Sequence, residues 1–369
     1  MAVRTWFLAV LLALFGAFGS ASPSHAQDQV VVVRVLERWV GSAAEIRSNE
    51  PATLPGGRTQ QGNLKLEARG NQLRLNGKIV LGAELQVGRS VETSQFEVLW
   101  PGGKRKYPGG LRVRVESGKL VLLNEVPLES YVAGVVSGEM PENWPLPALR
   151  AQAVLARTLA LRGGDHAKYA LCDLTHCQVY AGERRPEAVH VALETRGHVL
   201  TYRGSLIQPL FHSTCGGERV SNATIFGGAP LPYLQEGLDP YCADSPHAAR
   251  WTVRVLESEL SRALGLPRVE AVQVLSRSEG GWVAQLSVDG RQMTGYRFWQ
   301  AVGRELGWGM LKSMRFAVRR EGNAYVFEGQ GLGHGVGLCQ WGAKGQAERG
   351  IPYARILASY FPGTAIARR

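Results

Sequence analysis

Glu139 is the side chain whose neighbours best suit it to proton transfer. It lies between the end of an expected helix and the dipeptide Met140-Pro141, and Trp144 follows closely. Apolar and aromatic surroundings raise the pKa of a carboxyl group because they disfavour its charged form. A carboxyl group that stays protonated near neutral pH can donate a proton to the leaving oxygen of a glycosidic bond. Glu139 is therefore a candidate general acid, and the alternative is an ordinary surface glutamate in a loop.

A cysteine and histidine group forms the second candidate site. The segment 166–177 contains four residues of these types: His166, Cys172, His176 and Cys177. Thiolate and imidazole ligands close together in sequence suit tetrahedral zinc. An oxidising compartment would instead favour a Cys172–Cys177 disulfide, and free thiols are the third alternative. A zinc-dependent hydrolase at this group is a further, weaker hypothesis.

The segment 211–217, FHSTCGG, offers a thiol and an imidazole three residues apart. A cysteine nucleophile needs a nearby base, but neighbours in sequence seldom form such a pair. Cys215 could instead form a structural disulfide with Cys242, and we favour that interpretation outside the cytoplasm. The Ser213 and Thr214 hydroxyls are candidates to line a sugar-binding groove. Because the chain has five cysteines, a disulfide network would leave at least one sulfur unpaired or bound to metal.

The glycine-rich run 331–337 resembles a nucleotide-binding loop only superficially. A dinucleotide site needs this loop within a βαβ unit, followed by an acidic residue about twenty positions later, and the surrounding order does not provide that unit. The glycines more plausibly permit a tight turn that brings His334 and Gln340 to a substrate. His334 could equally be a core histidine. Four aromatic side chains are candidates to stack on sugar rings, although most such residues are simply packed: Trp144, Tyr180, Trp341 and Tyr360.

The elements that must position these residues change character along the chain. Residues 27 to about 125 alternate between apolar and polar side chains, and Asn76-Gly77 predicts a hairpin turn. A helical pattern begins near Val126 and ends near Gly138, because a residue before proline avoids helical geometry. An alanine-rich helix is expected over 147–162, ended by Gly163-Gly164 and packed closely inside the protein.

Further helices are expected near 256–264, 296–306 and 341–349, with strands near 313–328. Strands and helices occur in runs rather than in strict alternation, which indicates the α+β class. We therefore expect a β-rich N-terminal module followed by a mixed α+β domain with a substrate cleft. The expected boundaries are 1–26 for a signal peptide, 27–110 for the module and 111–369 for the domain.

The N-terminus and the charge limit where the protein acts. Arg4, the apolar run 6–18 and the small residues before position 27 are typical of a secretory signal peptide cut after Ala26, with an uncleaved anchor as the alternative. The net charge is +11, which favours anionic partners. Export makes acidic cell-wall polymers or a lipid surface more suitable partners than nucleic acid. A soluble basic surface without a dedicated partner is the simpler alternative.

Several sequence blocks, in a fixed order, resemble the SpoIID/LytB domain family. The resemblance spans about residues 110–366, and several blocks in the correct order make it specific. The blocks are VPLESYVAGVVSGEMPENWPLPALRAQAVLARTLALR at 126–162, QVYAG at 178–182, FHSTCGG at 211–217, GHGVGLCQWGAKGQ at 333–346 and YFPGT at 360–364.

This resemblance implies a peptidoglycan lytic transglycosylase that acts on peptide-stripped glycan strands between MurNAc and GlcNAc. The family's catalytic glutamate corresponds to Glu139, and the arginine of its A-Q-A-V-x-A-R-T helix corresponds to Arg157. A structural ion pair of Arg157 with Glu129 or Glu142 is the alternative. Substrate-binding roles are expected within the blocks for Gln178, Tyr180, Ser213, Thr214, His334 and Gln340.

The resemblance also implies two alternatives that the residues leave open. Some family members hold a metal near the 166–177 loop, which strengthens zinc as a cofactor at His166, Cys172 and Cys177, although many members lack these cysteines. Cys339 stands where many relatives have a serine, which suggests a third thiol near the same site. LytB-type relatives bind the cell wall without cutting it and enhance a separate N-acetylmuramoyl-L-alanine amidase. A non-catalytic enhancer is therefore the alternative function, with peptidoglycan and an amidase as its partners.

Overall fold

The computed structural model describes residues 29–80, 84–163, 171–175, 177–182, 184–247 and 250–369. It confirms the α+β class, with a β-rich N-terminal region and mixed helices and strands thereafter. The predicted signal peptide lies outside the described residues. In the described part of the chain, no helix combines the length and apolarity needed to cross a membrane.

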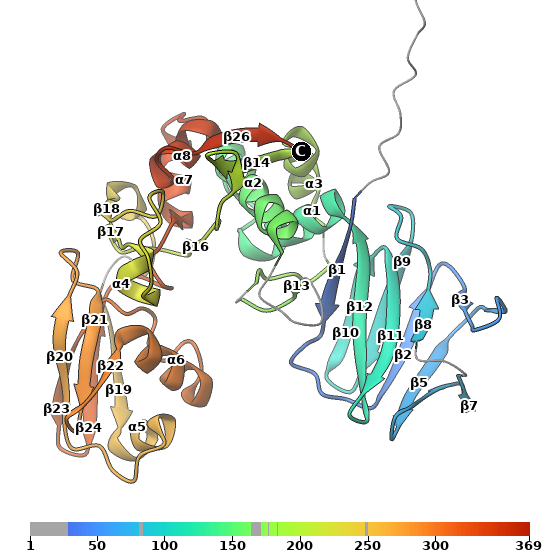
Figure 1. Cartoon of the computed structure of the whole chain (residues 1–369), viewed down its shortest axis with the longest axis horizontal. Helices are drawn as coiled ribbons and strands as arrows, with labels where there is room; N and C mark the ends of the chain where they lie inside the picture. The colour runs from blue at the N-terminus through green and yellow to red at the C-terminus, as the bar shows by residue number, and fades with distance from the viewer. Residues whose placement is uncertain (1–28, 81–83, 164–170, 176, 183, 248–249) are drawn as a thin grey trace, which may run out of the picture.

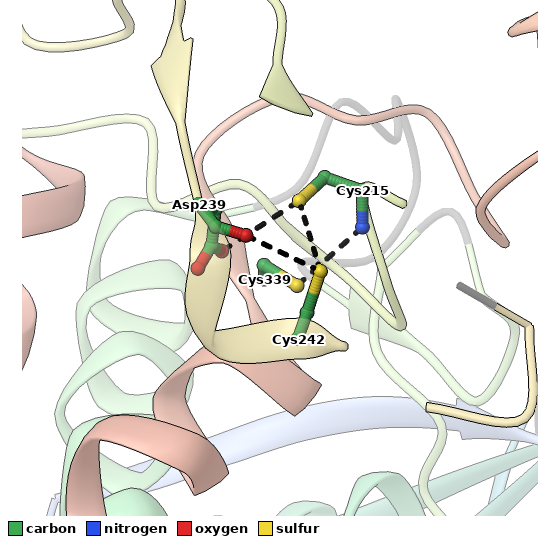
Figure 2. Close-up of side chains that lie close together, drawn as sticks. All are labelled: Cys215, Asp239, Cys242 and Cys339. Atoms are coloured by element: carbon green, nitrogen blue, oxygen red, sulfur yellow. Dashed lines mark hydrogen bonds between the residues drawn. The ribbon is translucent and has the colours of Figure 1, made fainter. Parts of the chain in front are cut away.

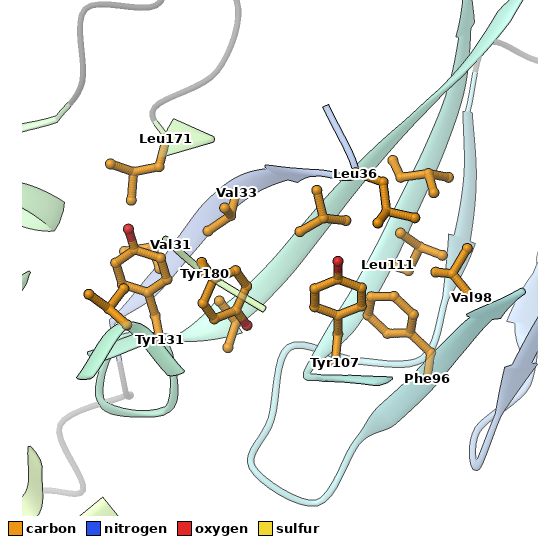
Figure 3. Close-up of a cluster of buried hydrophobic side chains, with 14 of the residues drawn as sticks. Val31, Val33, Leu36, Phe96, Val98, Tyr107, Leu111, Tyr131, Leu171 and Tyr180 are labelled. Carbon is orange, nitrogen blue, oxygen red and sulfur yellow. The ribbon is translucent and has the colours of Figure 1, made fainter. Parts of the chain in front are cut away.

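Two sheets build the N-terminal module, and their strands are antiparallel except that β13 runs parallel to β1. Apolar residues from both sheets share one hydrophobic core, in which Leu111 of one sheet lies near Phe96 and Val98 of the other (Figure 3). In spatial order, the strands of the larger sheet are β13 (Leu171–Cys172), β1 (Val30–Val35), β12 (Lys119–Pro127), β11 (Gly110–Glu116), β8 (Glu84–Val87), β3 (Ala52–Thr53) and β4 (Thr59–Gln60). Those of the smaller sheet are β10 (Gly103–Pro108), β9 (Gln95–Trp100), β2 (Ala43–Ser48), β5 (Leu64–Arg69), β6 (Gln72–Leu75) and β7 (Lys78–Ile79).

The predicted hairpin at Asn76-Gly77 is confirmed. Leu75 of β6 pairs with Lys78 of β7, so these two residues form the whole connection. Both have positive φ, 50° for Asn76 and 81° for Gly77, as a two-residue turn that follows the twist of the strands requires.

The larger sheet crosses the boundary that we expected at residue 110. Strands β11 and β12 follow that position, yet they hydrogen-bond to β8 and β1. Strand β12 then continues directly into helix α1 (Leu128–Glu139). The larger sheet therefore contains strands from both predicted segments, 27–110 and 111–369, and its strand β12 supports the start of α1.

Helix α2 (Leu146–Arg162) is the central helix of the following region. Its start lies one residue before the predicted Pro147, and its end agrees with the predicted stop. Ala153 and Ala156 face the N-terminal core, whereas Ala148 and Ala151 belong to a second core. The prediction of a small-sided, interior helix is confirmed, because these alanines let neighbouring elements approach from both sides.

Helices and short strands surround α2 (Figure 1). Helices α1 and α3 (Pro186–Glu194), α7 (Gln340–Glu348) and α8 (Tyr353–Tyr360) all contact it, as does β14 (His198–Tyr202), which pairs with β26 (Ala365–Arg368). The short elements between them are β15 (Ser205–Leu206), β16 (Phe211–His212), β17 (Glu218–Arg219), α4 (Asn222–Phe226), β18 (Gly237–Leu238), the 3₁₀ turn η1 (Pro240–Cys242) and β25 (Leu338–Cys339).

Residues 251–329 form a unit with a hydrophobic core of its own. Helices α5 (Glu257–Leu264) and α6 (Gly295–Leu306) contact each other, and both were predicted. The unit's two sheets contain β19 (Trp251–Leu256), β24 (Ala324–Gly329) and β23 (Phe316–Glu321), and β20 (Val272–Arg277), β21 (Val283–Val288) and β22 (Arg291–Thr294). Figure 1 shows this unit and the N-terminal module at opposite ends of the molecule. The sequence did not reveal that this segment has a separate core.

Candidate active site

Glu139 is the last residue of α1. Met140 follows in extended geometry, with φ −121° and ψ 139°, as expected for a residue before proline. The helix therefore ends where the E-M-P motif predicted. Glu139 itself is only partly exposed to solvent, so a ligand could reach its carboxyl group without the group being fully hydrated.

The QVYAG block holds the Glu139 carboxyl group from one side. The backbone N–H of Val179 donates a hydrogen bond to Glu139 Oε1 at 2.6 Å. This approach depends on Gly138, because a Cβ at that position would lie 2.7 Å from the carbonyl oxygen of Val179. The sequence carries no signal for this contact, because any residue at position 179 other than proline would offer the same N–H group.

The C-terminal block approaches Glu139 from another side. The Gln340 side-chain amide donates to the Glu139 carbonyl oxygen at 3.3 Å. Strand β25, just before Gln340, pairs in parallel with β16, and the backbone N–H of Trp341 donates to the Ser213 carbonyl oxygen at 3.1 Å. The QVYAG, FHSTCGG and 333–346 blocks thus lie at or beside the 126–162 block, which contains Glu139.

Burial gives Glu139 an unusual pKa. Loss of hydration raises the pKa of this carboxyl group from an ordinary 4.5 to about 7, although the hydrogen bonds from Val179 and Gln340 oppose the increase. Among the described residues, no charged side chain contributes to the shift. Glu139 can therefore exist in both protonation states near neutral pH, which a group that first donates and then accepts a proton requires.

The tryptophans near Glu139 pack against each other. The rings of Trp144 and Trp341 meet edge to face, with centroids 5.1 Å apart. Trp144 is 8% exposed, whereas Trp341 is half-buried and has Lys344 Nζ 5.4 Å from its ring centroid. Trp341 can still present part of its ring to a ligand. Trp144 and the deeply buried Tyr180 and Tyr360 cannot act as sugar-stacking platforms, which corrects that expectation.

Arg157 does not lie where a substrate could contact it. Its side chain is 0% exposed, and its guanidinium forms an ion pair with Glu129, including an Nε–Oε1 hydrogen bond of 3.0 Å. It also donates to the carbonyl oxygens of Ala192 at 2.9 Å and His198 at 3.1 Å. These contacts support the structural alternative, in which Arg157 connects α1, α2 and the segment around β14, and a catalytic role for Arg157 stays a prediction.

Four expected substrate-binding residues are also buried: Gln178, Tyr180, Thr214 and Gln340. Gln178 donates to Tyr131 Oη at 3.1 Å, and Tyr180 donates to Asn124 Oδ1 at 2.8 Å. Thr214 is fully buried. The hydrogen bonds of Gln178 and Tyr180 connect the 178–182 loop to α1 and β12. Substrate binding by these buried side chains stays a prediction.

Ser213 and His334 remain partly exposed. The backbone N–H of Val336 donates to His334 Nδ1 at 3.1 Å, and the His334 ring lies 5.5 Å from that of His212. Burial lowers the pKa of His334 to about 4, so this imidazole is neutral at neutral pH. Substrate binding by Ser213, His334 and Gln340 stays a prediction.

The first cysteine group is described only in part. His166 and His176 lie outside the described residues. Cys172 and Cys177 are both buried, and their mutual hydrogen bond together with burial raises the pKa of the Cys172 thiol. The two sulfurs are thus close together, and their role as metal ligands stays a prediction.

The second cysteine group differs from the sequence expectation. Cys215 and Cys242 are neighbours, with sulfurs 3.6 Å apart and no bond between them. Cys339 joins these two residues and not the Cys172 group, since the backbone N–H of Cys215 donates to Cys339 Sγ at 3.4 Å. The structure therefore corrects our placement of the fifth cysteine.

Fold and site together define a class of protein: an α+β chain with a half-buried, protonatable carboxyl group at the end of a helix. A family model described as Stage II sporulation protein matches residues 116–202, and one described as a domain of unknown function (DUF8618) matches residues 241–337. The chain is 30% identical over 266 residues to Stage II sporulation protein D of Bacillus subtilis, covering 66% of this chain and 75% of that protein. It is 32% identical over 272 residues to an uncharacterized protein of Brachyspira hyodysenteriae, covering 71% and 72%.

A third relative, the Amidase enhancer of Bacillus subtilis, is 27% identical over 283 residues, which span 63% of this chain and 40% of that protein. The similarity to the sporulation proteins extends over most of both chains. The chain therefore belongs to the SpoIID/LytB family.

Proposed function

We propose that this protein is a peptidoglycan lytic transglycosylase, which cleaves MurNAc–GlcNAc bonds in peptide-stripped glycan strands. The observation that supports this proposal most directly is the half-buried Glu139 carboxyl group, whose pKa burial raises to about 7. Membership of the SpoIID/LytB family supports a function in the cell wall. The net charge of +11 is compatible with an anionic wall polymer as substrate.

A single carboxyl group is sufficient for this reaction. Protonated Glu139 donates its proton to the glycosidic oxygen as the bond from that oxygen to C1 of MurNAc breaks. The resulting carboxylate then accepts the proton of the MurNAc C6 hydroxyl, and the O6 electron pair forms the new bond to C1. The products are a free GlcNAc hydroxyl and a 1,6-anhydroMurNAc end, and Glu139 is protonated again.

The proposed mechanism needs no second charged group beside Glu139. Hydrolytic glycosidases typically use two carboxyl groups, because one must activate water or attack the sugar. Here the attacking hydroxyl belongs to the substrate. Among the described residues, no second charged group influences the Glu139 pKa.

Digestion of purified, peptide-stripped glycan strands tests the proposal. Mass spectrometry should detect 1,6-anhydroMurNAc ends with the wild-type protein and none with Glu139→Gln. Glu142→Gln is a matched control, because Glu142 is an exposed carboxyl group in the adjacent loop. A wild-type protein without anhydro products, or equal product from Glu139→Gln, would argue against cleavage.

A non-catalytic amidase enhancer is the second candidate function. Its support is the 27% identity to the Amidase enhancer, in an alignment that covers only 40% of that relative. An enhancer would bind peptidoglycan sacculi and stimulate an added N-acetylmuramoyl-L-alanine amidase equally well as wild type and as Glu139→Gln. Sedimentation with sacculi and amidase assays on both proteins would distinguish the two functions.

We also propose that the protein acts outside the cytoplasmic membrane, in the periplasm or cell wall. The cell-wall relatives and the predicted signal peptide support export. Mass determination of the protein recovered from the cell envelope would test cleavage after Ala26, and an intact N-terminus would support the anchor alternative.

A further inference from the structure

Four buried metal-binding side chains converge beside the start of α7 (Figure 2). They come from separate segments: Cys215 from the FHSTCGG block, Asp239 and Cys242 from the start and end of the η1 turn, and Cys339 from the end of β25. One ligand atom of each residue lies within 4.8 Å of all the others. We propose that Cys215, Asp239, Cys242 and Cys339 form a structural zinc site.

The distances between these atoms fit a tetrahedral ion. Cys215 Sγ is 3.6 Å from Cys242 Sγ and 3.6 Å from Asp239 Oδ2. Tetrahedral zinc with ordinary Zn–S and Zn–O bonds separates two sulfurs by about 3.8 Å and a sulfur from an oxygen by about 3.5 Å. Both separations agree with the edges of such a tetrahedron, and the other ligand-atom pairs lie within 4.8 Å.

The surrounding hydrogen bonds also suit anionic ligands. Tyr360 Oη donates to Asp239 Oδ2 at 2.8 Å, and the backbone N–H of Tyr241 donates to the other carboxylate oxygen at 3.2 Å. Cys339 Sγ accepts from the backbone N–H groups of Cys215 and Gly342, at 3.4 and 3.3 Å. Outer hydrogen bonds of this kind orient metal ligands and stabilise their charge.

Two glycines of α7 permit this arrangement. A Cβ on Gly342 would lie 2.1 Å from Tyr360 Oη and 2.2 Å from Asp239 Oδ2, and one on Gly345 would lie 2.1 Å from the carbonyl oxygen of Tyr241. Helix α7 can therefore approach the η1 turn only with glycine at these positions. The close approach brings Cys339 to the other three ligands.

A zinc ion would partly neutralise the charge of its four ligands. Asp239 is 2% exposed, and its carboxylate lies among three buried sulfurs. Binding Zn²⁺ displaces the three thiol protons to solvent and compensates two of the four ligand charges. The hydrogen bonds that Asp239 and Cys339 accept stabilise the remaining two negative charges.

A Cys215–Cys242 disulfide, the expectation from sequence, uses these groups less completely. It requires a two-electron oxidant and a sulfur separation of about 2.05 Å, against the observed 3.6 Å. It would leave the Cys339 sulfur and the Asp239 carboxyl group without a role. A zinc ion accounts for all four side chains.

The site is separate from the predicted metal group of the 166–177 loop. Cys172 belongs to β13, which pairs with β1 of the N-terminal sheet, whereas Cys215, Cys242 and Cys339 belong to the second core. Four protein ligands leave no position for water, so the ion would be structural. By fixing Cys339, it would hold the next residue, Gln340, against Glu139.

Anomalous diffraction from the wild-type full chain, purified without chelators and grown with zinc, tests the site without any substitution. Data on both sides of the zinc absorption edge should place a zinc atom between the four side chains. An intact mass lower by two hydrogens under non-reducing conditions, with a 215–242 cross-linked peptide, would overturn the proposal. So would a crystal with these sulfurs reduced and no anomalous peak among them.

Solution measurements separate this site from the Cys172 group. In a Cys172→Ser/Cys177→Ser background, plasma mass spectrometry should still find one zinc per chain, and a further Cys339→Ser should remove it. Asp239→Asn should weaken zinc binding by at least about tenfold in chelator competition, whereas Asp244→Asn, at an exposed carboxyl group nearby, should not. Retention of zinc in the Cys339→Ser protein, or equal affinity in both aspartate variants, would contradict the assignment.

Discussion

At the scale of single residues, Glu139 combines properties that usually exclude each other. Desolvation keeps its proton near neutral pH, yet the side chain is partly exposed and accepts a short hydrogen bond from Val179. Arg157 shows the opposite case, a charged group in a helix with its guanidinium satisfied by Glu129 and backbone carbonyl oxygens. Any buried guanidinium needs such partners. The position of Arg157 within a family block is therefore not by itself evidence of a catalytic role.

The pKa of Glu139 predicts a pH-dependent stability. Its folded-state pKa of about 7 lies above the ordinary 4.5, so folding favours the protonated form. Relative to Glu139→Gln, the wild-type protein should keep this contribution below about pH 4.5 and lose it as pH rises through about 7. The loss is at most about 3 kcal/mol at about 1.4 kcal/mol per pKa unit, and partial solvent exposure reduces it. Urea unfolding of both proteins between pH 4 and 9 measures the difference, and a pH-independent difference would contradict the burial of the acid.

At the scale of elements, the site depends on where helices and strands end. Helix α1 ends at Glu139, α7 begins at Gln340, and the loop after β13 supplies Val179. Each of these groups is fixed by the packing of a longer element, since β12 supports α1 and β16 pairs with β25 before α7. The groups around the Glu139 carboxyl therefore lie at helix ends and in a loop. The packing of the longer helices and strands fixes their positions.

Gly138→Ala should disturb the site through one of these ends. The new methyl group would lie 2.7 Å from the Val179 carbonyl oxygen, so the 178–182 loop must move away from α1. Loss of the Val179 hydrogen bond removes a contribution that lowers the Glu139 pKa. We expect that pKa to rise above its wild-type value, measured by carbon NMR of labelled glutamate. Gly309→Ala is a control, because a Cβ there meets no atom within 4 Å, and an unchanged Glu139 pKa in Gly138→Ala would refute the expectation.

At the scale of the whole molecule, three cores divide the stabilising contacts. The N-terminal core extends into α1 and one side of α2, the second core contains the other side of α2 with α7 and α8, and the third lies within residues 251–329. Glu139 lies where α1 of the first core meets α7 of the second. Because the third core is separate, its local unfolding need not disturb that junction.

Phe298→Ala tests this division. Phe298 is fully buried in the third core, where it contacts the rings of Phe316 and Phe327. Removing a buried phenylalanine costs about 3–5 kcal/mol. Hydrogen exchange detected by mass spectrometry should show lost protection within 251–329 and unchanged protection in α1 and α2. A uniform loss across the chain would mean that the cores unfold as one unit.

The sequence by itself determined those features that depend on local rules. Proline after Met140 ended α1, Asn76-Gly77 formed the hairpin, and the alanines of 147–162 produced an interior helix. The family blocks likewise identified Glu139 as the acid to examine. Local steric preferences and side-chain periodicity decide such features, so neighbouring residues are sufficient to predict them.

Only the tertiary structure decided which distant groups meet. The Val179 N–H beside Glu139, the burial of Arg157, Gln178 and Tyr180, and the arrival of Cys339 and Asp239 at Cys215 and Cys242 all depend on contacts between segments far apart in the chain. The separate core of 251–329 and the sheet that crosses residue 110 depend on the same kind of contact. Burial and donor–acceptor geometry are properties of the assembled cores, and residue types along the chain do not contain them.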